Sequence, residues 1–119
     1  MLNKALDIAY KAHLGQIDKA GDPYILHPMR VVLHCQTEDE KIVALLHDVV
    51  EDTPITLEEL KTQGFSDDVL AALKCLTKIK GEDYQTFIQR VATNPLAVKV
   101  KIQDLKDNME LSRLGGKPH

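Results

Sequence analysis

Hydrophobic residues along this chain recur every three or four positions, which is the spacing that places them on one face of an α-helix. In residues 2–14, for example, Leu2, Leu6, Ala9 and His13 fall on a single stripe. No segment shows the strict alternation of hydrophobic and polar residues that is typical of a half-buried β-strand. The pattern therefore predicts an all-α protein built as a compact bundle of helices.

Capping and turn residues set the expected ends of these helices. Thr37 and Glu40 have the spacing of a capping box, in which each side chain satisfies a backbone group of the first turn. Pro28 suits the first turn of a helix, so His27 is expected at or beside the residue that caps it. We expect helices over residues 2–14, 28–36 and 38–51, from Thr56 to near Gly64, from Ser66 through Thr77, and over residues 83–92 and 95–113.

One of these helices carries ionisable residues inside an apolar run, ALLHDVVEDT (residues 44–53). His47 and Glu51 are four residues apart, as are Asp48 and Asp52, so each pair shares a strip of helix surface. A helix end that exposes polar residues to water would explain Glu51 and Asp52. It explains His47 and Asp48 less well, because a buried charge costs on the order of several kcal/mol unless it is paired or bound to a metal.

Two further polar residues interrupt apolar segments: His27 in PYILHPMRVV and Asp104 in LAVKVKIQDLKDNM. A single histidine in such a place is more often structural, but two imidazoles and two carboxylates form a nitrogen and oxygen set that suits Mn²⁺, Fe²⁺ or Zn²⁺. Four protein ligands leave positions for water and a phosphate oxygen only at a five- or six-coordinate ion. The candidate set of His27, His47, Asp48 and Asp104 therefore favours manganese or iron over a closed zinc site.

Length and charge narrow the function further. The 119 residues fit a single domain, residues 1–119, and leave no room for a second catalytic domain. A net charge of −3 argues against a nucleic-acid polymer as partner, although a local group of lysines would suffice for a small phosphorylated ligand. No apolar run reaches the roughly 20 residues that span a bilayer, and the amphipathic N-terminus does not resemble a signal peptide, so we expect a cytoplasmic protein without membrane attachment.

The ordered residues His27, His47, Asp48 and Asp104 resemble the H…HD…D pattern of the HD-domain metal-dependent phosphohydrolases. The surrounding segments are more specific, because they resemble the hydrolase domain of the RelA/SpoT proteins and the stand-alone small alarmone hydrolases. These segments are GDPYILHPMRV (21–31), ALLHDVVEDT (44–53) and NPLAVKVKIQDLKDNMELSRL (94–114). The resemblance implies an all-α HD-domain bundle in which the four residues hold one divalent metal, Mn²⁺ in that family. Family members remove the 3′-pyrophosphate of ppGpp or pppGpp.

The same resemblance implies catalytic roles for two carboxylates. In the family, the Glu-Asp pair after the HD doublet positions and activates the attacking water, which here means Glu51 and Asp52. The chemistry is consistent with general principles, since a metal acidifies its bound water and polarises a phosphoryl oxygen while a nearby carboxylate accepts the proton.

Four other residues are candidates for contact with the nucleotide. Lys19 aligns with a family lysine near the substrate, although a solvated loop lysine is the alternative, and Asn108 matches a family asparagine that contacts the sugar. Tyr24 lines the pocket or packs against the core. Lys101, three residues before Asp104, is expected to face the site, whereas Lys99 is expected to be solvated.

The chain also departs from the family pattern. Asp18 stands where an arginine usually precedes the loop lysine, and Leu105, Lys106 and Asp107 follow Asp104 where the family reads Arg-Leu-His. Leu111 replaces a common threonine. These changes affect positions that recognise the base, so the alternatives are an HD hydrolase of another nucleotide or phosphate ester, or a metal-stabilised nucleotide-binding module without turnover.

The C-terminus is a further departure. Stand-alone relatives continue with additional helices, whereas this chain ends in GGKPH, so the domain is expected to be shortened there. Such a shortening would leave part of the pocket wall or a hydrophobic face uncovered, and a homo-oligomer would cover it.

Overall fold

The computed structural model describes residues 1–113, with side chains through residue 109. Its helices are α1 (Leu2–Ala12), α2 (Leu26–Leu33), α3 (Glu38–Asp52), α4 (Leu57–Thr62), α5 (Asp67–Leu76), α6 (Tyr84–Ala92) and α7 (Pro95–Arg113). Within the described residues, the only β pairing is an isolated bridge between Ile17 and Pro23. The predicted all-α bundle is confirmed. The C-terminal sequence GGKPH lies outside the described residues.

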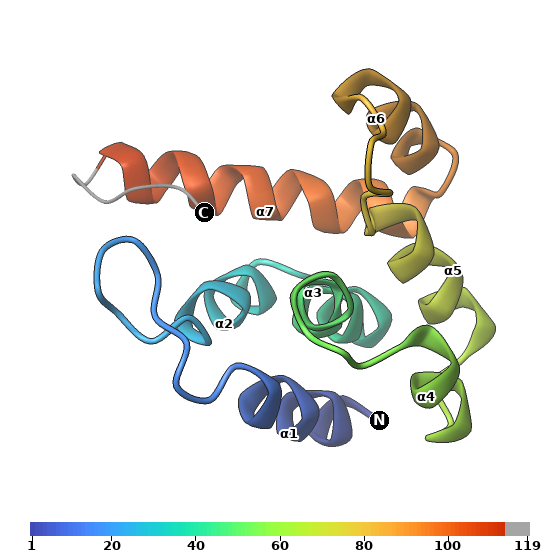
Figure 1. Ribbon diagram of the computed structural model, residues 1–119, viewed down its shortest axis with the longest axis horizontal. Coiled ribbons are helices and arrows are strands. Elements are labelled where there is room, and N and C mark those ends of the chain that lie inside the picture. The colour runs from blue at the N-terminus through green and yellow to red at the C-terminus, as the bar shows by residue number, and fades with distance from the viewer. Residues whose placement is uncertain (114–119) are drawn as a thin grey trace.

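Helix α3 forms the centre of the bundle (Figure 1). It packs against α1, α2, α5 and α7, and α7 in turn packs against α2, α5 and α6. Most of its apolar residues are fully buried, among them Val43, Leu45, Leu46 and Val49. Removing their apolar surface from water stabilises the fold by roughly 1.5–3 kcal/mol for each large side chain. The same burial carries His47 and Asp48 into the interior of the molecule.

Side-chain caps start the helices at the places that the sequence predicted. Thr37 accepts a hydrogen bond from the backbone N–H of Glu40, and the Glu40 carboxylate accepts one from the N–H of Thr37, which completes the capping box. Thr56 and Ser66 likewise cap α4 and α5. Each such cap contributes about 1 kcal/mol to stability.

The prediction for the start of α2 was wrong by two residues. The helix begins at Leu26 and its N-cap is Ile25, so His27 lies inside the first turn rather than at or beside the cap. Turn-type hydrogen bonds from the Leu26 and His27 N–H groups to the preceding loop extend the helix backward past Pro28. This position turns the His27 side chain inward, where it is 1% exposed.

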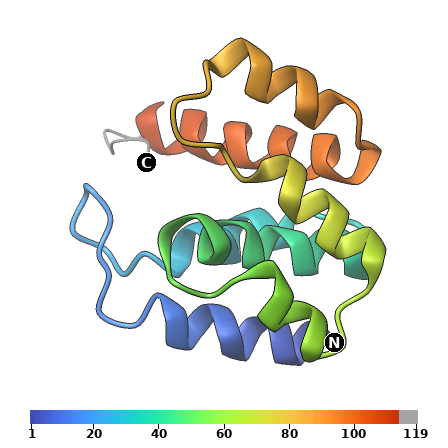
Figure 2. The ribbon, with the colours of Figure 1, turned by 45° about the vertical axis from the view of Figure 1, so that its right-hand side comes forward.

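Between α1 and α2 the chain forms a loop, residues 13–25, that projects from the bundle (Figure 2). Gly15 and Gly21 adopt positive φ angles of 85° and 89°, which a residue with a side chain rarely adopts. Asp18 holds the tip of the loop, because its carboxylate accepts hydrogen bonds from the N–H groups of Ala20 and Asp22. The loop therefore has a defined shape of its own.

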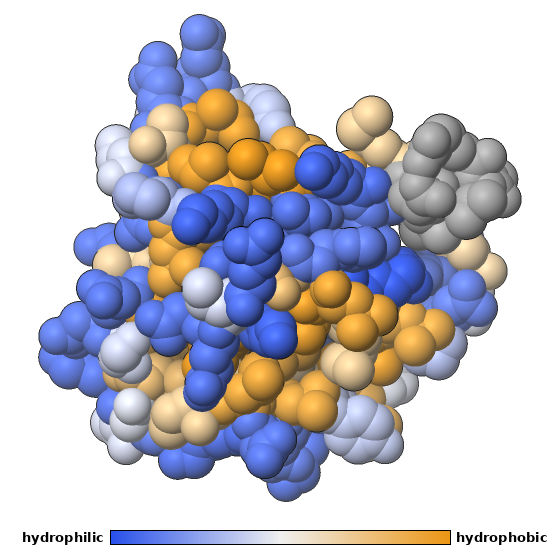
Figure 3. Space-filling view, turned by 180° about the vertical axis from the view of Figure 1, so that it is seen from behind, coloured by the Kyte–Doolittle hydropathy of each residue, from blue (hydrophilic) through white to orange (hydrophobic). Residues whose placement is uncertain are grey.

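No helix among the described residues is both long enough and apolar enough to cross a bilayer. Hydrophobic side chains gather in patches among polar ones on the face shown in Figure 3. Over the whole surface, Leu14, Ile17 and Leu33 are among the exposed apolar residues.

Cys35 is buried and Cys75 is partly buried, and both are free thiols. Burial raises the pKa of the Cys35 thiol to about 11, as expected for a core cysteine.

Candidate metal centre and active site

Three helices bring the four predicted metal-binding residues together. His27 comes from α2, His47 and Asp48 come from α3, and Asp104 comes from α7. Nε2 of His27 lies 2.7 Å from Oδ1 of Asp104 and 4.0 Å from Oδ2 of Asp48. Nε2 of His47 lies 3.2 Å from Oδ1 of Asp48 and 3.9 Å from Oδ1 of Asp104. Residues separated by up to 77 positions in sequence thus form one cluster.

The donor chemistry of this cluster fits a divalent ion. Two ligands at about 2.0–2.2 Å from one ion lie roughly 2.8–4.3 Å apart, and the nitrogen to oxygen distances in the cluster are close to this range. Oδ2 of Asp48 is buried and has no hydrogen-bond partner in the described part of the chain, so an acceptor remains for a cation.

The present side-chain positions are nevertheless those of a hydrogen-bonded cluster. No group of three or more histidine, cysteine, aspartate or glutamate side chains within the described residues is arranged to hold an ion as it stands. In these positions Nε2 of His27 contacts Oδ1 of Asp104 directly, at 2.7 Å. Binding an ion at these four residues would replace the hydrogen bond between His27 and Asp104 by a bond from each of them to the ion.

The cluster lines a cavity of about 380 Å³. Its wall includes the two predicted catalytic carboxylates, Glu51 and Asp52, which lie at the C-terminal end of α3. The predicted substrate residues Tyr24 and Lys101 also line it. The full set of lining residues is Tyr24, His27, His47, Asp48, Glu51, Asp52, Leu76, Lys78, Tyr84, Phe87, Lys101 and Asp104.

The two carboxylates at the end of α3 hold protons more tightly than usual. Burial raises the pKa of Glu51, and the nearby negative charges of Asp48 and Asp52 raise it further. Burial and the charge of Asp48 likewise raise the pKa of Asp52. A carboxylate whose pKa is moved toward neutral pH accepts a proton more readily, as a general base requires.

On the side of the cluster formed by α2 and α7, contacts between His27 and carboxylates shift the pKa values. Burial alone would raise the pKa of Asp104, but its hydrogen bond to His27 and the nearby His47 lower that pKa to about 2. Burial alone would lower the pKa of His27, yet its contacts with Asp104 and Asp107 raise it. For Tyr24, burial, the Asp48 charge and a hydrogen bond to Asp48 raise the phenol pKa, so this side chain stays protonated.

Lys101 is the cation nearest to the cluster along α7. Its ammonium lies 3.6 Å from Oδ2 of Asp104 and 5.5 Å from the centre of the Phe87 ring. Both contacts direct the charged end of the side chain to the cavity, where it could meet a phosphate oxygen.

Two predicted substrate residues lie elsewhere. Lys19 is exposed in the loop between α1 and α2, and Asn108 is partly buried on α7; neither lines the 380 Å³ cavity. The Asn108 amide oxygen is buried and without a hydrogen-bond partner among the described residues. Asp18, which stands where the resembling family usually has an arginine, is buried and engaged with amides of its own loop.

Sequence reasoning missed several residues of the site. Lys78, in the connection after α5, and Tyr84 and Phe87, on α6, also line the 380 Å³ cavity. Nothing in the local sequence marks them, because Lys78 reads as a turn lysine and Phe87 as a core residue. Only the packing of α6 against α5 and α7 places them at the cavity.

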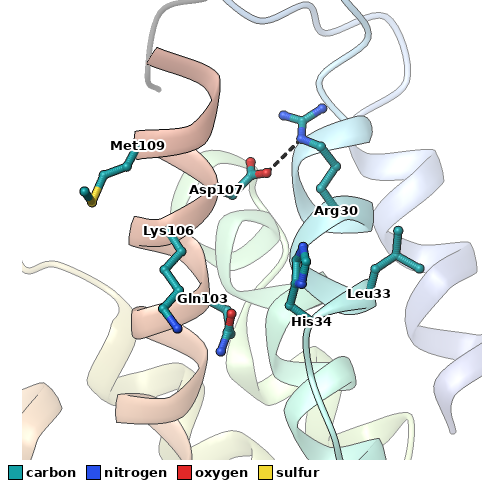
Figure 4. A pocket seen from close by; sticks show the side chains of 7 residues that line it. All are labelled: Arg30, Leu33, His34, Gln103, Lys106, Asp107 and Met109. Atoms are coloured by element: carbon teal, nitrogen blue, oxygen red, sulfur yellow. Dashed lines mark hydrogen bonds and ion pairs between the residues drawn. The ribbon is translucent and has the colours of Figure 1, made fainter. Parts of the chain in front are cut away.

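Asp107 and Arg30 were also missed as parts of the site. Asp107 contacts Nδ1 of His27 at 2.7 Å, and its other oxygen accepts a hydrogen bond from Nε of Arg30 at 2.9 Å. Both residues line a larger cavity, of about 660 Å³, between α2 and α7 (Figure 4). The i to i+3 spacing of Asp104 and Asp107 is the signal that could have found Asp107, since it puts both carboxylates on one face of α7.

The chain is similar in sequence to a known family and to several known proteins. A family model described as HD domain matches residues 5–105. A guanosine-3′,5′-bis(diphosphate) 3′-pyrophosphohydrolase of Aquifex aeolicus is 33% identical over 92% of this chain and 17% of its own length. A probable GTP pyrophosphokinase of Mycobacterium leprae is 33% identical over 95% of this chain and 16% of its own length. The chain thus spans about a sixth of the length of these curated relatives.

A solved structure gives a closer match in size. It was reported for a metazoan ortholog of SpoT that hydrolyses ppGpp and plays a role in starvation responses. The two structures superpose with a TM-score of 0.82 and 27% sequence identity, and the match covers 99% of this chain and 72% of the other.

Proposed function

The chain belongs to the HD-domain family, as its motifs predicted, and from that premise we propose that it is a divalent-metal-dependent phosphohydrolase. Its favoured substrates are ppGpp and pppGpp, from which it removes the 3′-pyrophosphate. The names of the Aquifex relative and of the metazoan structure, both of which specify hydrolysis of this nucleotide, support the substrate. The observation that carries the proposal is the joining of His27, His47, Asp48 and Asp104 with Glu51 and Asp52 around one cavity.

We assign the metal site to His27, His47, Asp48 and Asp104. A divalent ion supplies a Lewis acid for a phosphoryl oxygen and lowers the pKa of a water molecule. The mixed nitrogen and oxygen donors favour Mn²⁺, with Fe²⁺ or Zn²⁺ as alternatives. The four side chains would have to exchange the contact between His27 and Asp104 for contacts to the ion.

We assign the handling of the water to Glu51 and Asp52. Both line the same cavity as the proposed ligands, and both have raised pKa values. Each follows an α3 ligand by four residues, so the carboxylates lie one helical turn beyond His47 and Asp48. A carboxylate at that place can orient a water molecule and accept its proton as the bond to phosphorus forms.

We propose that the phosphate groups of the substrate bind near the lysine side chains of the cavity wall. Lys78 and Lys101 both line it and would offset part of the negative charge of a pyrophosphate. Tyr24, Tyr84 and Phe87 give the same cavity an aromatic wall that could contact a base or a sugar. Lys19 and Asn108 stay predictions, since each lies outside the cavity lining.

Hydrolysis is favoured over pyrophosphate transfer for a chemical reason. The relative from Mycobacterium leprae bears the name of a pyrophosphokinase, but this chain spans only 16% of it. The residues gathered at the cavity are metal-binding and water-handling groups, which a hydrolase requires. The proposal therefore concerns hydrolysis alone.

The decisive experiment measures pyrophosphate release from ppGpp by protein stripped of metal with a chelator, with and without added Mn²⁺. We expect release that depends on Mn²⁺ and that is lost in Asp48→Ala, with circular dichroism confirming that the variant folds. Wild-type protein that binds Mn²⁺ but leaves ppGpp intact would refute the alarmone assignment while retaining the metal site.

A second candidate is hydrolysis of another nucleotide or phosphate ester. It is favoured by Asp18, whose carboxylate serves the loop backbone in a place where the family has a base-stacking arginine. A panel of nucleotides assayed beside ppGpp separates the two. A metal-stabilised binding module without turnover would bind these nucleotides and release no product from any of them.

We further propose that residues 1–119 form one domain, which acts in the cytoplasm on a small nucleotide rather than on a nucleic-acid polymer or at a membrane. The net charge of −3 supports the absence of a polymer partner. Exposed apolar residues such as Leu33 would support a homo-oligomer, which sedimentation analysis would test.

A further inference from the structure

The ring of His27 is held from both edges by one helix. Nε2 contacts Asp104 at 2.7 Å and Nδ1 contacts Asp107 at 2.7 Å, and both carboxylates belong to α7. Because an imidazole ring is planar, contacts at both nitrogens fix its rotation as well as its position. His27 therefore reaches the cluster with a single orientation.

The two nitrogens face different surroundings. Nε2 is the atom directed to the proposed metal ligands, since it lies near both Asp104 and Asp48. Nδ1 faces Asp107, which does not line the 380 Å³ cavity. A histidine binds a metal through a nitrogen that carries no hydrogen, so the other nitrogen must carry one and usually donates it to a carboxylate or carbonyl.

Asp107 is itself fixed by a second contact. Its side chain is 7% exposed, and Nε of Arg30 donates to the oxygen that His27 does not use. Arg30 follows His27 by three residues on α2, so the two side chains extend from the same helix toward one carboxylate (Figure 4 shows the pair of Arg30 and Asp107). The arginine compensates a carboxylate charge that would be costly to bury alone.

We propose that Asp107, held by Arg30, is a positioning residue that directs Nε2 of His27 to the metal. This inference rests on the proposed function, because it assumes that His27 is a ligand. Asp107 occupies the position at which the resembling family usually has a histidine. Asp107 thus contributes to metal binding in addition to linking α2 to α7.

The test measures Mn²⁺ affinity by electron paramagnetic resonance for wild type, Asp107→Leu, Asp107→Asn and Arg30→Met. We expect Asp107→Leu to bind Mn²⁺ about 100-fold more weakly and Asp107→Asn about tenfold more weakly, within the range for loss of an outer partner of a metal-binding histidine. Arg30→Met should weaken binding less than Asp107→Leu. Lys106→Met is the matched control, because Lys106 is an exposed cation adjacent to Asp107, and its loss should leave the affinity unchanged.

Nuclear magnetic resonance of protein with ¹⁵N-labelled histidine supplies a second readout. On addition of diamagnetic Zn²⁺, wild-type His27 should lose its Nε2 hydrogen and keep the one on Nδ1. In Asp107→Leu the Nδ1 hydrogen has lost its acceptor, so it should exchange rapidly with solvent and its signal should be lost. Metal binding through Nδ1 in wild type would overturn the inference.

The outcomes distinguish a failure of the role assigned to Asp107 from a failure of the proposed metal-dependent function. If Asp107→Leu and Asp107→Asn melt at lower temperature yet bind Mn²⁺ as tightly as wild type, Asp107 only joins two helices and the inference is overturned. If Asp107→Leu does not fold, the milder Asp107→Asn decides by the same affinity criterion. If wild type binds no divalent ion at all, the proposed function fails, and the inference fails with it for that separate reason.

Discussion

The two sides of the cavity differ in how their charged side chains are paired. On the side of α2 and α7, both nitrogens of His27 contact carboxylates, and the pKa of Asp104 is lowered to about 2. On the side of α3, burial and the negative charge of Asp48 raise the pKa values of Glu51 and Asp52. Paired groups are suited to holding a position, whereas groups with raised pKa values are suited to exchanging a proton.

This contrast separates two kinds of variant. A change on the paired side should disturb metal binding and, through it, catalysis. A change at Glu51 or Asp52 should disturb catalysis and leave the metal in place. Metal affinity and turnover, measured separately, test that division.

Asp104→Ala should abolish measurable hydrolysis. The substitution removes one proposed ligand, whose carboxylate also contacts Nε2 of His27 at 2.7 Å. Loss of several kcal/mol of metal-based stabilisation corresponds to about 10³-fold or more in rate. Mn²⁺ titration should show binding lost together with activity; a variant that still binds Mn²⁺ with wild-type affinity would remove Asp104 from the ligand set.

Glu51→Gln should lower kcat by about 10²- to 10⁴-fold, which is the usual contribution of a general base. The amide preserves the shape of the side chain but cannot accept the proton. Mn²⁺ affinity should stay near that of wild type, because Glu51 is outside the proposed ligand set. Parallel loss of metal binding and turnover would instead make Glu51 a ligand and would erase the contrast between the two sides.

The metal-free protein should lose stability above about pH 6.5. The pKa of His27 is raised above 6.5 in the folded state by its contacts with Asp104 and Asp107, so its contribution is present below 6.5 and is lost as pH rises through the folded value. Urea unfolding of chelator-stripped protein across this range measures the effect. His27→Gln should show a flatter profile there, and an equally steep decline in that variant would place the titration elsewhere.

On the acid side the sign is reversed. The folded pKa of Asp104 is about 2 instead of 3.8, so its contribution is present above 3.8 and is lost as pH falls toward 2. The raised pKa values of Glu51 and Asp52 act at higher pH, above the ordinary values of 4.5 and 3.8, and therefore do not change stability in the range where Asp104 titrates. Asp104→Asn should therefore lose less stability than wild type between pH 4 and about pH 2.

Lys101→Met should produce the smallest change, a fall in kcat/KM of about tenfold, equivalent to about 1.4 kcal/mol. A lost charge-assisted contact to phosphate is expected to raise KM more than it lowers kcat. Lys99→Met is the matched control, because Lys99 is exposed and two residues away on the same helix. Equal effects from the two variants would indicate a general influence of charge and no specific contact.

Local sequence was sufficient for most of the fold. The spacing of apolar residues and the caps at Thr37, Thr56 and Ser66 are short-range features, and the corresponding helices start where they predicted. The start of α2 was misjudged because the helix continues backward from Pro28 through backbone bonds to the loop. A proline is compatible with the whole first turn, so its position alone does not define the first residue.

The candidate site likewise depends partly on local sequence and partly on contacts between segments that are distant in sequence. The sequence by itself determined the residue types, since the HD doublet, its following acids and the later aspartate can be recognised from spacing and resemblance. Only the tertiary structure decided which side chains meet. The roles of Asp107, Arg30 and Lys78 depend on contacts between helices that are distant in sequence, and no local pattern encodes such a contact. Helix periodicity assigns a residue to a face, but the packing of α2, α3 and α7 decides what that face meets.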